Sequence, residues 1–384
     1  MRREQIAWAG LAAMTVSFGL NFSVGVFFAP TAASYGVSAT ALALAAALGT
    51  TVTGLAQPLV GGLLDRVGAK RVLIGGLTLI SASYLVLAVV RTTWEFLTVY
   101  VLLGGIGFAS SSTLTVTTLI GRTLANQVGP ALTRAAVGIN LGQLTAPWVA
   151  TALFEPVGVR VTYALLGGVG LVVTGVLWWV LPVDHIAGVA RRAESLAGRG
   201  RVLISFGLHS ATLYVVILML PEHAVETDWS IAAAGRLVAV AALAAGLTSA
   251  AMARLQRWYR PEVLLQILYG MRIVALALAV CVPGPSVLIA VAAVFGAASF
   301  PVIPLTMAIM SRGLDPARMG RTLAPAWVIH QLAAAAGLAV ASGIHARTDS
   351  YRGYFALGMA FSIAAARLVA PVRKPRTELV ISTA

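Results

Sequence analysis

The chain is built from apolar runs of about twenty residues separated by short polar segments, and about 20 apolar residues in a helix cross the ~30 Å core of a bilayer. Helices are the expected spanning form, because each satisfies its own backbone hydrogen bonds in lipid. A transmembrane barrel would instead alternate polar and apolar residues over about ten positions. We therefore predict an all-α membrane protein.

Twelve runs are long enough to span the membrane. The predicted spans are 6–28, 38–63, 71–91, 95–120, 135–155, 161–182, 202–220, 230–252, 262–282, 286–311, 323–345 and 351–370.

Composition supports a membrane protein and argues against several other classes. Hydrophobic residues make up 59% and charged residues 10% of the chain, whereas soluble domains are about 25% charged. The net charge of +14 would suggest a nucleic-acid partner in a soluble chain. Here the basic residues lie in short loops, where positive charge sets topology, so no nucleic acid is expected. The chain has one cysteine, so no intramolecular disulfide is expected. Its Cys and His residues do not have the spacing of metal ligands, so we expect no metal and no cofactor.

The loop charges predict the orientation of the chain. The start, "MRREQIAWAG", lacks a cleavage pattern and is interpreted as the beginning of the first spanning helix. If the N-terminus is cytoplasmic, nearly all basic residues fall in inner loops or inner helix ends, and both termini are cytoplasmic. The basic residues in outer segments are then Arg91, Arg160, Arg347 and Arg352.

An internal repeat divides the chain in two. A shift of half the length superimposes glycines and a phenylalanine of the second half on those of the first. The coincident pairs are Gly54 with Gly246, Gly104 with Gly296, Phe108 with Phe300, and Gly121 with Gly313. We predict six-helix bundles over 1–182 and 202–370, a basic, lipid-facing cytoplasmic linker over 183–201 and a cytoplasmic tail over 371–384. Two pseudo-symmetric bundles suit a transporter with its site at the midplane.

A dense group of charges between the second and third predicted spans carries a family resemblance. The stretch "GGLLDRVGAKR" resembles the signature of the Major Facilitator Superfamily at Gly61, Asp65, Arg66, Gly68, Lys70 and Arg71. The resemblance implies the major facilitator fold and a cytoplasmic latch, whose charges pair across the two bundles in the outward-open state. The alternative is a tight turn with topogenic charge. Because the second-half counterpart has Arg257 where the repeat predicts an acid, any latch is expected to be one-sided.

Further motifs resemble the bacterial monocarboxylate-transporter-like branch, which includes oxalate/formate exchangers. They are "FGLNFSVGVFFAP", "GINLGQLTAPW" and "IHQLAAAAGLAVASGIHARTDSY". This resemblance implies a monomeric, multi-pass carrier in the bacterial inner (cytoplasmic) membrane. The chain departs from the pattern at Tyr100 and Val101, where many proton-coupled members have an arginine, and in 135–155, which lacks the antiporter Gly-Pro pair.

The predicted spans contain basic groups but no acid well inside them. The interior basic residues are His209, Arg236, Arg272 and His330. Because a charge in lipid is costly, such residues generally face a cavity or a partner. A positive interior without carboxylates favours an anionic substrate.

Two arginines receive different assignments. Arg236, in the predicted span 230–252, is the candidate clamp for a substrate carboxylate, because a guanidinium stays charged and binds bidentately. Snorkelling to the outer headgroups is the alternative. The arginine of characterised relatives lies deeper in this helix, so the positions do not match. Arg272, in 262–282, is predicted to bond backbone carbonyls of neighbouring helices.

Neutral and titratable groups complete the predicted substrate site. His209 and His330 could carry a coupled proton, donate to an anion, or form interhelical bonds. The remaining candidate substrate-binding residues are Gln331, Asn21, Ser17, Asn140 and Gln143.

These features predict a secondary active or facilitative transporter that moves a small organic anion, of monocarboxylate type, by alternating access. Proton symport, uniport and anion exchange all remain open. The alternatives are an efflux transporter for multiple amphipathic compounds, or a non-transporting receptor or assembly factor. The chain contains no nucleotide-binding loop and no catalytic-triad spacing, so we do not expect an enzyme. The expected partners are the anion, H⁺ and membrane lipids.

Overall fold

The computed structural model describes residues 3–36, 39–124, 128–184, 196, 198–229, 231–282 and 284–370. All regular elements within these ranges are helical, which confirms the predicted all-α fold. The predicted tail over 371–384 and most of the predicted linker over 183–201 lie outside the described residues.

The first half of the chain contains α1 to α7. Its helices are α1 (Arg3–Tyr35), α2 (Ala39–Val67), α3 (Ala69–Leu87), α4 (Thr93–Thr98), η1 (Val99–Gly104), α5 (Gly105–Ser111), α6 (Thr113–Thr123) and α7 (Val128–Val180). The segments α4, η1, α5 and α6 follow one another through the predicted span 95–120. Within α7 the helix is interrupted at Gly158, whose φ of 79° is readily adopted by glycine.

The second half contains α8 to α14. Its helices are α8 (Gly200–Glu226), α9 (Ile231–Leu255), α10 (Pro261–Cys281), α11 (Pro285–Ser299), α12 (Val302–Met310), η3 (Pro316–Arg318), α13 (Met319–Thr348) and α14 (Arg352–Val369). Pro301 separates α11 from α12, because proline has no N–H to continue the hydrogen-bond ladder.

Nine helical segments in the described ranges are long and apolar enough to cross a membrane. The segment α7 is one of the nine, although it contains both predicted spans 135–155 and 161–182. The fold therefore has membrane-spanning helices, while the count of twelve spans stays a prediction.

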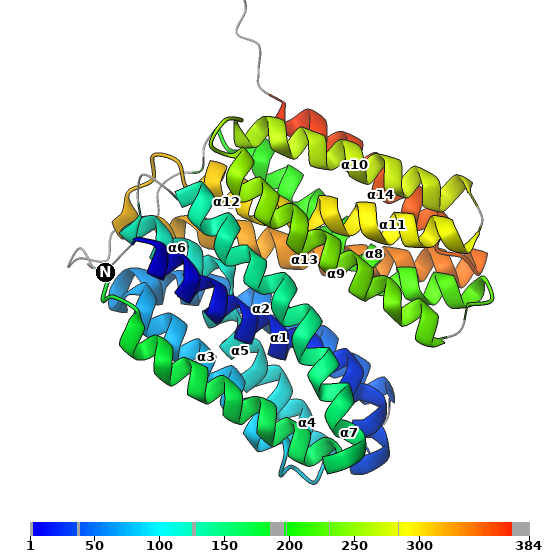
Figure 1. Cartoon of the computed structure of the whole chain (residues 1–384), viewed down its shortest axis with the longest axis horizontal. Helices are drawn as coiled ribbons and strands as arrows, with labels where there is room; N and C mark the ends of the chain where they lie inside the picture. The colour runs from blue at the N-terminus through cyan, green and yellow to red at the C-terminus, as the bar shows by residue number, and fades with distance from the viewer. Residues whose placement is uncertain are drawn as a thin grey trace, which may run out of the picture.

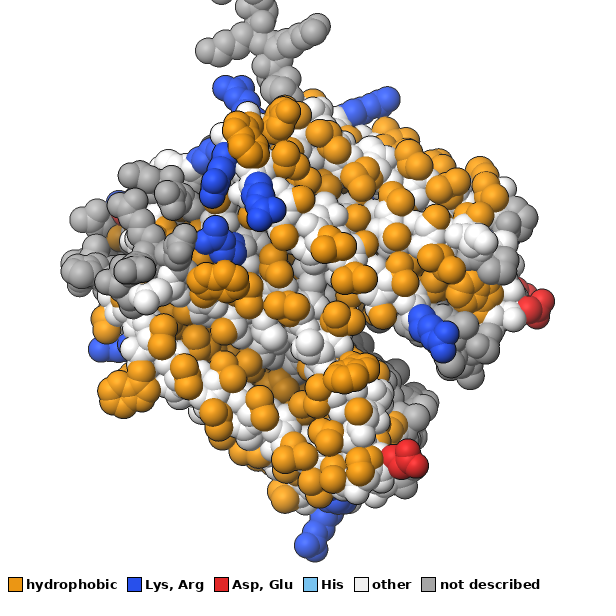
Figure 2. Space-filling view, viewed as in Figure 1, with side chains coloured by type: hydrophobic (Ala, Val, Ile, Leu, Met, Phe, Trp, Pro, Cys, Tyr) orange, Lys and Arg blue, Asp and Glu red, His pale blue; other side chains and the backbone are white. Residues whose placement is uncertain are grey.

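The two halves lie side by side and diverge toward one end (Figure 1). The pairs α2 with α13 and α7 with α9 pack across the halves. We call the end where α2 finishes and α13 begins, at Asp65 and Gly320, the closed end, and the opposite end the open end. In Figure 2 the surface is hollowed between the halves toward the open end.

Large apolar side chains are exposed on the outside of both halves, as lipid contact requires. Trp179 is 86% exposed on α7 and Leu247 is 67% exposed on α9. Hydrophobic side chains are spread over the whole visible face in Figure 2, and Lys and Arg side chains gather mainly toward the closed end. An apolar surface bounded by basic residues fits a bilayer on this face.

Candidate functional site

Three charged side chains from separate segments form a buried ion cluster at the closed end. Arg122, near the end of α6, donates to Asp65 Oδ1 at 2.8 Å and to Asp184 Oδ2 at 2.9 Å. Each of these side chains is 2–3% exposed. Arg122 also donates to the carbonyl of Leu64 at 2.8 Å. Because the cluster is shielded from water, its charge-assisted hydrogen bonds are stronger than those of a surface pair.

Asp65 also joins the first half to the second. Its carboxylate accepts hydrogen bonds from the backbone N–H of Gly320 at 3.0 Å and of Arg321 at 2.9 Å. Both N–H groups lie in the first turn of α13, where donors are otherwise unpaired and the helix end carries partial positive charge. In addition, Arg122 Nε donates to the carbonyl of Pro316 at 2.7 Å. A carboxylate of α2 therefore caps a helix of the other half.

Glycines allow the backbones of α2 and α13 to approach closely at this point. A Cβ atom on Gly61 would lie 2.7 Å from the Gly320 carbonyl oxygen and 2.9 Å from Ala324 Cβ. A Cβ on Gly320 would likewise lie 2.7 Å from the Gly61 carbonyl oxygen. Contacts below about 3 Å are not tolerated, so a side chain at either position would separate the two helices.

The turn between α2 and α3 is held by Asp184. Gly68 has a φ of 93°, a backbone conformation that favours glycine, and it reverses the chain between the two helices. Asp184 accepts from the backbone N–H groups of Ala69 at 2.8 Å and Lys70 at 3.1 Å. The ammonium of Lys70 donates to the Leu181 carbonyl at 2.7 Å. The segment that follows α7 is thereby attached to the start of α3.

These contacts explain the charge state of Asp184. Burial alone would raise the pKa of Asp184, but hydrogen bonds from the Ala69 and Lys70 backbone and from Arg122 outweigh it, so the pKa lies below its usual value. Asp184 is therefore ionised at neutral pH and remains a partner for Arg122.

The other two predicted latch residues, Arg66 and Arg71, have exposed side chains. The cation that pairs with Asp65 is Arg122 instead.

A second polar cluster lies in the interior of the second half. Arg272 of α10 is completely buried, and its Nη1 lies 2.5 Å from His209 Nδ1 on α8. Its Nη2 donates to the His209 carbonyl at 3.3 Å, the kind of contact predicted for Arg272. Since a guanidinium only donates, we assign His209 as neutral, with Nδ1 accepting and the proton on Nε2. No carboxylate pairs with Arg272 in the described part of the chain.

His330 of α13 lies beside this pair in an aromatic enclosure. Ring centroids of His330 and Phe206 are 4.5 Å apart, those of His330 and Trp327 5.1 Å, and those of His330 and Tyr214 5.9 Å. The His209 and His330 rings are 6.0 Å apart. The fold thus brings together two predicted site histidines from helices α8 and α13.

The enclosure adjoins the interface between the halves. Tyr214 stacks on Phe22 of α1, with ring centroids 6.2 Å apart. Gln331, next to His330, packs on α2, where a Cβ on Gly54 would lie 3.0 Å from Gln331 Cβ. Relative movement of the halves would therefore change the surroundings of His330.

Several buried polar atoms of this cluster lack a hydrogen-bond partner among the described residues. They are Nε2 of His209, both ring nitrogens of His330, Nε1 of Trp327, Nε of Arg272 and Oε1 of Gln331. Buried polar groups are nearly always paired in proteins, because leaving one unpaired is costly. This set, mostly N–H donors next to a guanidinium, is suited to bind an anion. We call His209, Arg272, His330, Trp327 and Gln331 the interior cluster.

The other predicted polar residues lie elsewhere. Ser17 Oγ is 2.7 Å from Ser111 Oγ in the first half. Asn140 donates to Ser249 Oγ of α9 at 3.4 Å, a contact between the halves. Asn21 and Gln143 are half-buried.

Arg236, the predicted carboxylate clamp, is exposed in the second turn of α9. Because α9 ends beside the cavity that Gln256 and Gly121 both line at the closed end, Arg236, near the start of α9, belongs to the open end. Within the described ranges, no three His, Cys, Asp or Glu side chains are grouped so that they could hold a metal ion.

Comparison with known proteins identifies the family of this architecture. The model of the Major Facilitator Superfamily matches residues 10–338. The chain belongs to the Major Facilitator Superfamily. A relative within the superfamily, the uncharacterised MFS-type transporter YcxA of Bacillus subtilis (strain 168), is 24% identical over 338 residues, 80% of each chain.

Solved superfamily structures share the fold at low sequence identity. The human organic anion transporter MFSD10 (TETRAN) superimposes with a TM-score of 0.82 at 15% identity, over 96% of this chain and 100% of that one. A bacterial homologue of the iron transporter ferroportin in the outward-facing state superimposes with a TM-score of 0.75 at 15% identity, over 96% of this chain and 98% of that one. The family match over most of the chain, together with the apolar spanning segments, makes it a multi-pass membrane transporter of the Major Facilitator Superfamily and not an enzyme.

The sequence analysis missed several residues of the ion cluster at the closed end and of the surroundings of the interior cluster. Arg122 was placed only among the basic residues of inner loops and helix ends, and Asp184 only in the predicted linker 183–201, although the chain has just 13 acids and Asp184 closely follows a predicted span. The aromatic residues around His330 gave no signal, since aromatic side chains are ordinary in apolar helices.

Proposed function

We propose that this transporter moves a small organic anion by alternating access, as a secondary active or facilitative carrier. The observation that carries the proposal is Arg272, completely buried and bonded to the ring and carbonyl of His209. Bringing a guanidinium out of water is costly unless a counter-charge or several acceptors compensate it. A bound anion would supply that missing negative charge.

The proposed site uses His209 to present the charge of Arg272. Because Arg272 donates to Nδ1, the Nε2–H of His209 becomes a stronger donor, as in polarised hydrogen-bond chains. The anion would accept hydrogen bonds from this N–H group and from the ring N–H groups of His330 and Trp327. The ring nitrogens of both residues are buried, and both rings lie close to the His209–Arg272 pair or to each other. Protonation of His330 would give proton symport, the coupling mode that we propose.

Alternating access is proposed to use the ion cluster at the closed end. In this proposal, Asp65 and Arg122 hold α13 while the open end admits the anion, and they release when the halves tilt the other way. Positive charge at the closed end supports a cytoplasmic location for that end and for both termini, in a bacterial inner membrane. The halves would correspond to the bundles 1–182 and 202–370, working as a monomer.

The proposed substrate is a monocarboxylate, because helix motifs in this sequence resemble those of the monocarboxylate-transporter-like branch. Arg236 would attract anions to the opening, since an exposed charge raises the local concentration of counter-ions.

A thermal-shift screen tests this proposal. Purified protein is titrated with short monocarboxylates and, separately, with cationic amphipathic dyes. We expect saturable stabilisation by a carboxylate, lost in Arg272→Gln and kept in Arg367→Gln, a matched change at an exposed arginine of α14. Stabilisation by dyes alone would instead favour multidrug efflux, for which the aromatic enclosure of Phe206, Tyr214 and Trp327 would be the binding surface.

A further inference from the structure

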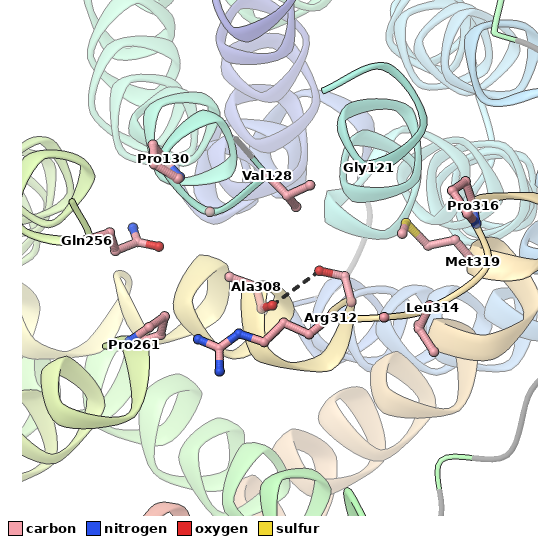
Figure 3. Close-up of a pocket in the computed structure, with 13 residues that line it drawn as sticks. Gly121, Val128, Pro130, Gln256, Pro261, Ala308, Arg312, Leu314, Pro316 and Met319 are labelled. Atoms are coloured by element: carbon pink, nitrogen blue, oxygen red, sulfur yellow. Dashed lines mark hydrogen bonds between the residues drawn. The ribbon is translucent and has the colours of Figure 1, made fainter. Parts of the chain in front are cut away.

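A cavity of about 470 Å³ lies at the closed end, between the two halves. The first half contributes Gly121 and the start of α7 at Val128 to Pro130. The second half contributes Pro261 at the start of α10 and the segment after α12 that carries Arg312. Figure 3 shows these two walls facing each other, with the Arg312 side chain extending along the cavity toward Pro261. The cavity is separate from the interior cluster and requires both halves to be together.

The segment that carries Arg312 is held in place. Arg199 donates to the carbonyl of Met310 at 2.7 Å and also to that of Arg312. The Arg312 guanidinium pairs with Glu262 Oε1 at 2.5 Å, yet its side chain remains 51% exposed. A half-exposed guanidinium keeps donors available for a second acceptor, because it has five N–H groups.

The surroundings of the cavity carry an excess of positive charge. The segment between α9 and α10 contains exposed Arg257 and Arg260 just before Pro261. The nearby acids in the described part of the chain already have partners, since Glu262 pairs with Arg312 and Asp315 pairs with Arg318. An occupant of this cavity is therefore expected to be negatively charged.

The same segment carries large exposed aromatic side chains between its arginines. Trp258 is 72% exposed and Tyr259 is 53% exposed. Tryptophan and tyrosine next to basic residues are typical of the membrane–water interface, at the level of the lipid headgroups. The negative group closest to such a position is the phosphate of a membrane lipid.

We propose that this cavity binds the headgroup of an anionic phospholipid and that its occupancy holds the two halves together at the closed end. Arg312 receives the phosphate, Arg257 and Arg260 attract it, and the acyl chains stay in the leaflet beside Trp258. Because the walls come from both halves, the lipid binds best to the conformation in which they are joined, and it stabilises that conformation by its differential affinity. Lipid binding at this cavity would be independent of the substrate that the interior cluster carries.

Lipid titration of the full-length chain tests the site. Detergent-solubilised protein is titrated with short-chain phosphatidylglycerol, with phosphatidylcholine of the same chain length, and with inorganic phosphate, and the thermal midpoint is recorded. We expect saturable stabilisation by phosphatidylglycerol alone. Arg312→Gln should raise the half-saturating concentration about fivefold, as expected for one basic contact at a membrane surface. Arg312→Lys should retain most of the affinity, and Arg367→Gln, outside the cavity, should behave as the wild type.

Hydrogen–deuterium exchange provides the second readout. The backbone amides of Gly320 and Arg321 donate to Asp65 only while the closed end is joined. At the concentration that half-saturates the wild type, phosphatidylglycerol should slow their exchange clearly in the wild type and much less in Arg312→Gln, which binds about fivefold more weakly. Equal effects of both lipids, or an unchanged response in Arg312→Gln, would overturn the site. An equal effect of inorganic phosphate would overturn the lipid assignment.

Discussion

The carboxylate of Asp65 and the backbone N–H of Gly320 are 255 positions apart in the sequence and 3.0 Å apart in the fold. Asp65 pairs with Arg122 within its own half and at the same time caps the first turn of α13 in the other. The same side chain is therefore part of the rigid ion cluster and of the contact between the halves. Separating the halves at this end requires water to replace both backbone hydrogen bonds.

Replacing Asp65 by asparagine should loosen the closed end without unfolding the protein. The asparagine side chain would carry no charge, and its NH₂ group would face donors, so we expect the joined conformation to lose about 2 kcal/mol, the usual range for hydrogen bonds to a charged group. Transport turnover should slow, and exchange of the Gly320 amide should accelerate about 30-fold. Asp349→Asn is the matched control, because Asp349 is exposed and asparagine tolerates its φ of 48°. If transport and amide exchange were unchanged in Asp65→Asn, the charged segment between α2 and α3 would serve only to set membrane topology.

A side chain at Gly61 should separate α2 from α13. In Gly61→Val, the new Cβ would meet the Gly320 carbonyl oxygen at 2.7 Å, so the backbones must move apart. We expect faster exchange of the Gly320 and Arg321 amides and weaker transport. Gly75→Val places the same change in α3, where a Cβ meets nothing within 4 Å, and should leave both measurements near the wild type. Similar behaviour of the two variants would argue against a specific close approach.

Asp184 should make stability depend on pH in the acid range. Its pKa is lowered in the folded protein, because backbone and Arg122 hydrogen bonds outweigh the effect of burial. The folded state therefore gains stability from Asp184 above the unfolded pKa of about 3.9 and loses it as the pH falls through the lower folded pKa. Thermal midpoints of the wild type and Asp184→Asn should converge as the pH falls from 6 toward that range. A difference that stays constant with pH would exclude this linkage.

His209 and Arg272 should be strongly coupled in stability. Replacing His209 by leucine leaves the buried guanidinium without its ring acceptor, at a cost of about 2 kcal/mol. Removing both groups, in His209→Leu with Arg272→Met, should be less destabilising than the sum of the single changes, because no charge is then left unpaired. Denaturation of the four proteins in detergent measures the coupling. Additive effects would show that the pair contributes nothing beyond packing.

The two interior arginines predicted from the sequence should differ in their response to salt. Arg236 is exposed and Arg272 is buried, so screening by ions acts mainly on the former. Arg236→Gln should raise the apparent KM for an anionic substrate several-fold at low ionic strength and much less at high ionic strength. Arg272→Gln should remove substrate binding at both low and high ionic strength. If Arg236→Gln removed binding at every salt concentration while Arg272→Gln did not, the substrate site would lie at Arg236 on α9 and not at the interior cluster.

Local sequence patterns predicted the helical class and most helix positions. A run such as 71–91 must become a helix in lipid whatever its neighbours are, because its backbone has no other hydrogen-bond partners there. The turn at Gly68 was equally predictable, since the adjacent charges end the apolar run and glycine accepts the required φ of 93°. The excess of interior basic residues over acids was also evident from the sequence, because it depends only on which residues fall inside the runs.

The tertiary structure alone decided the partners of those charges. Asp65 pairs with Arg122 rather than with the neighbouring Arg66, because the end of α6 packs beside α2 while Arg66 points outward. Arg272 lies next to His209 because α10 and α8 pack in the same half, and Gly61 lies against Gly320 because α2 packs on α13. Spans, turns and charge balance follow from residues close together in the chain. Pairings between residues tens or hundreds of positions apart follow from helix packing, which single-sequence patterns do not encode.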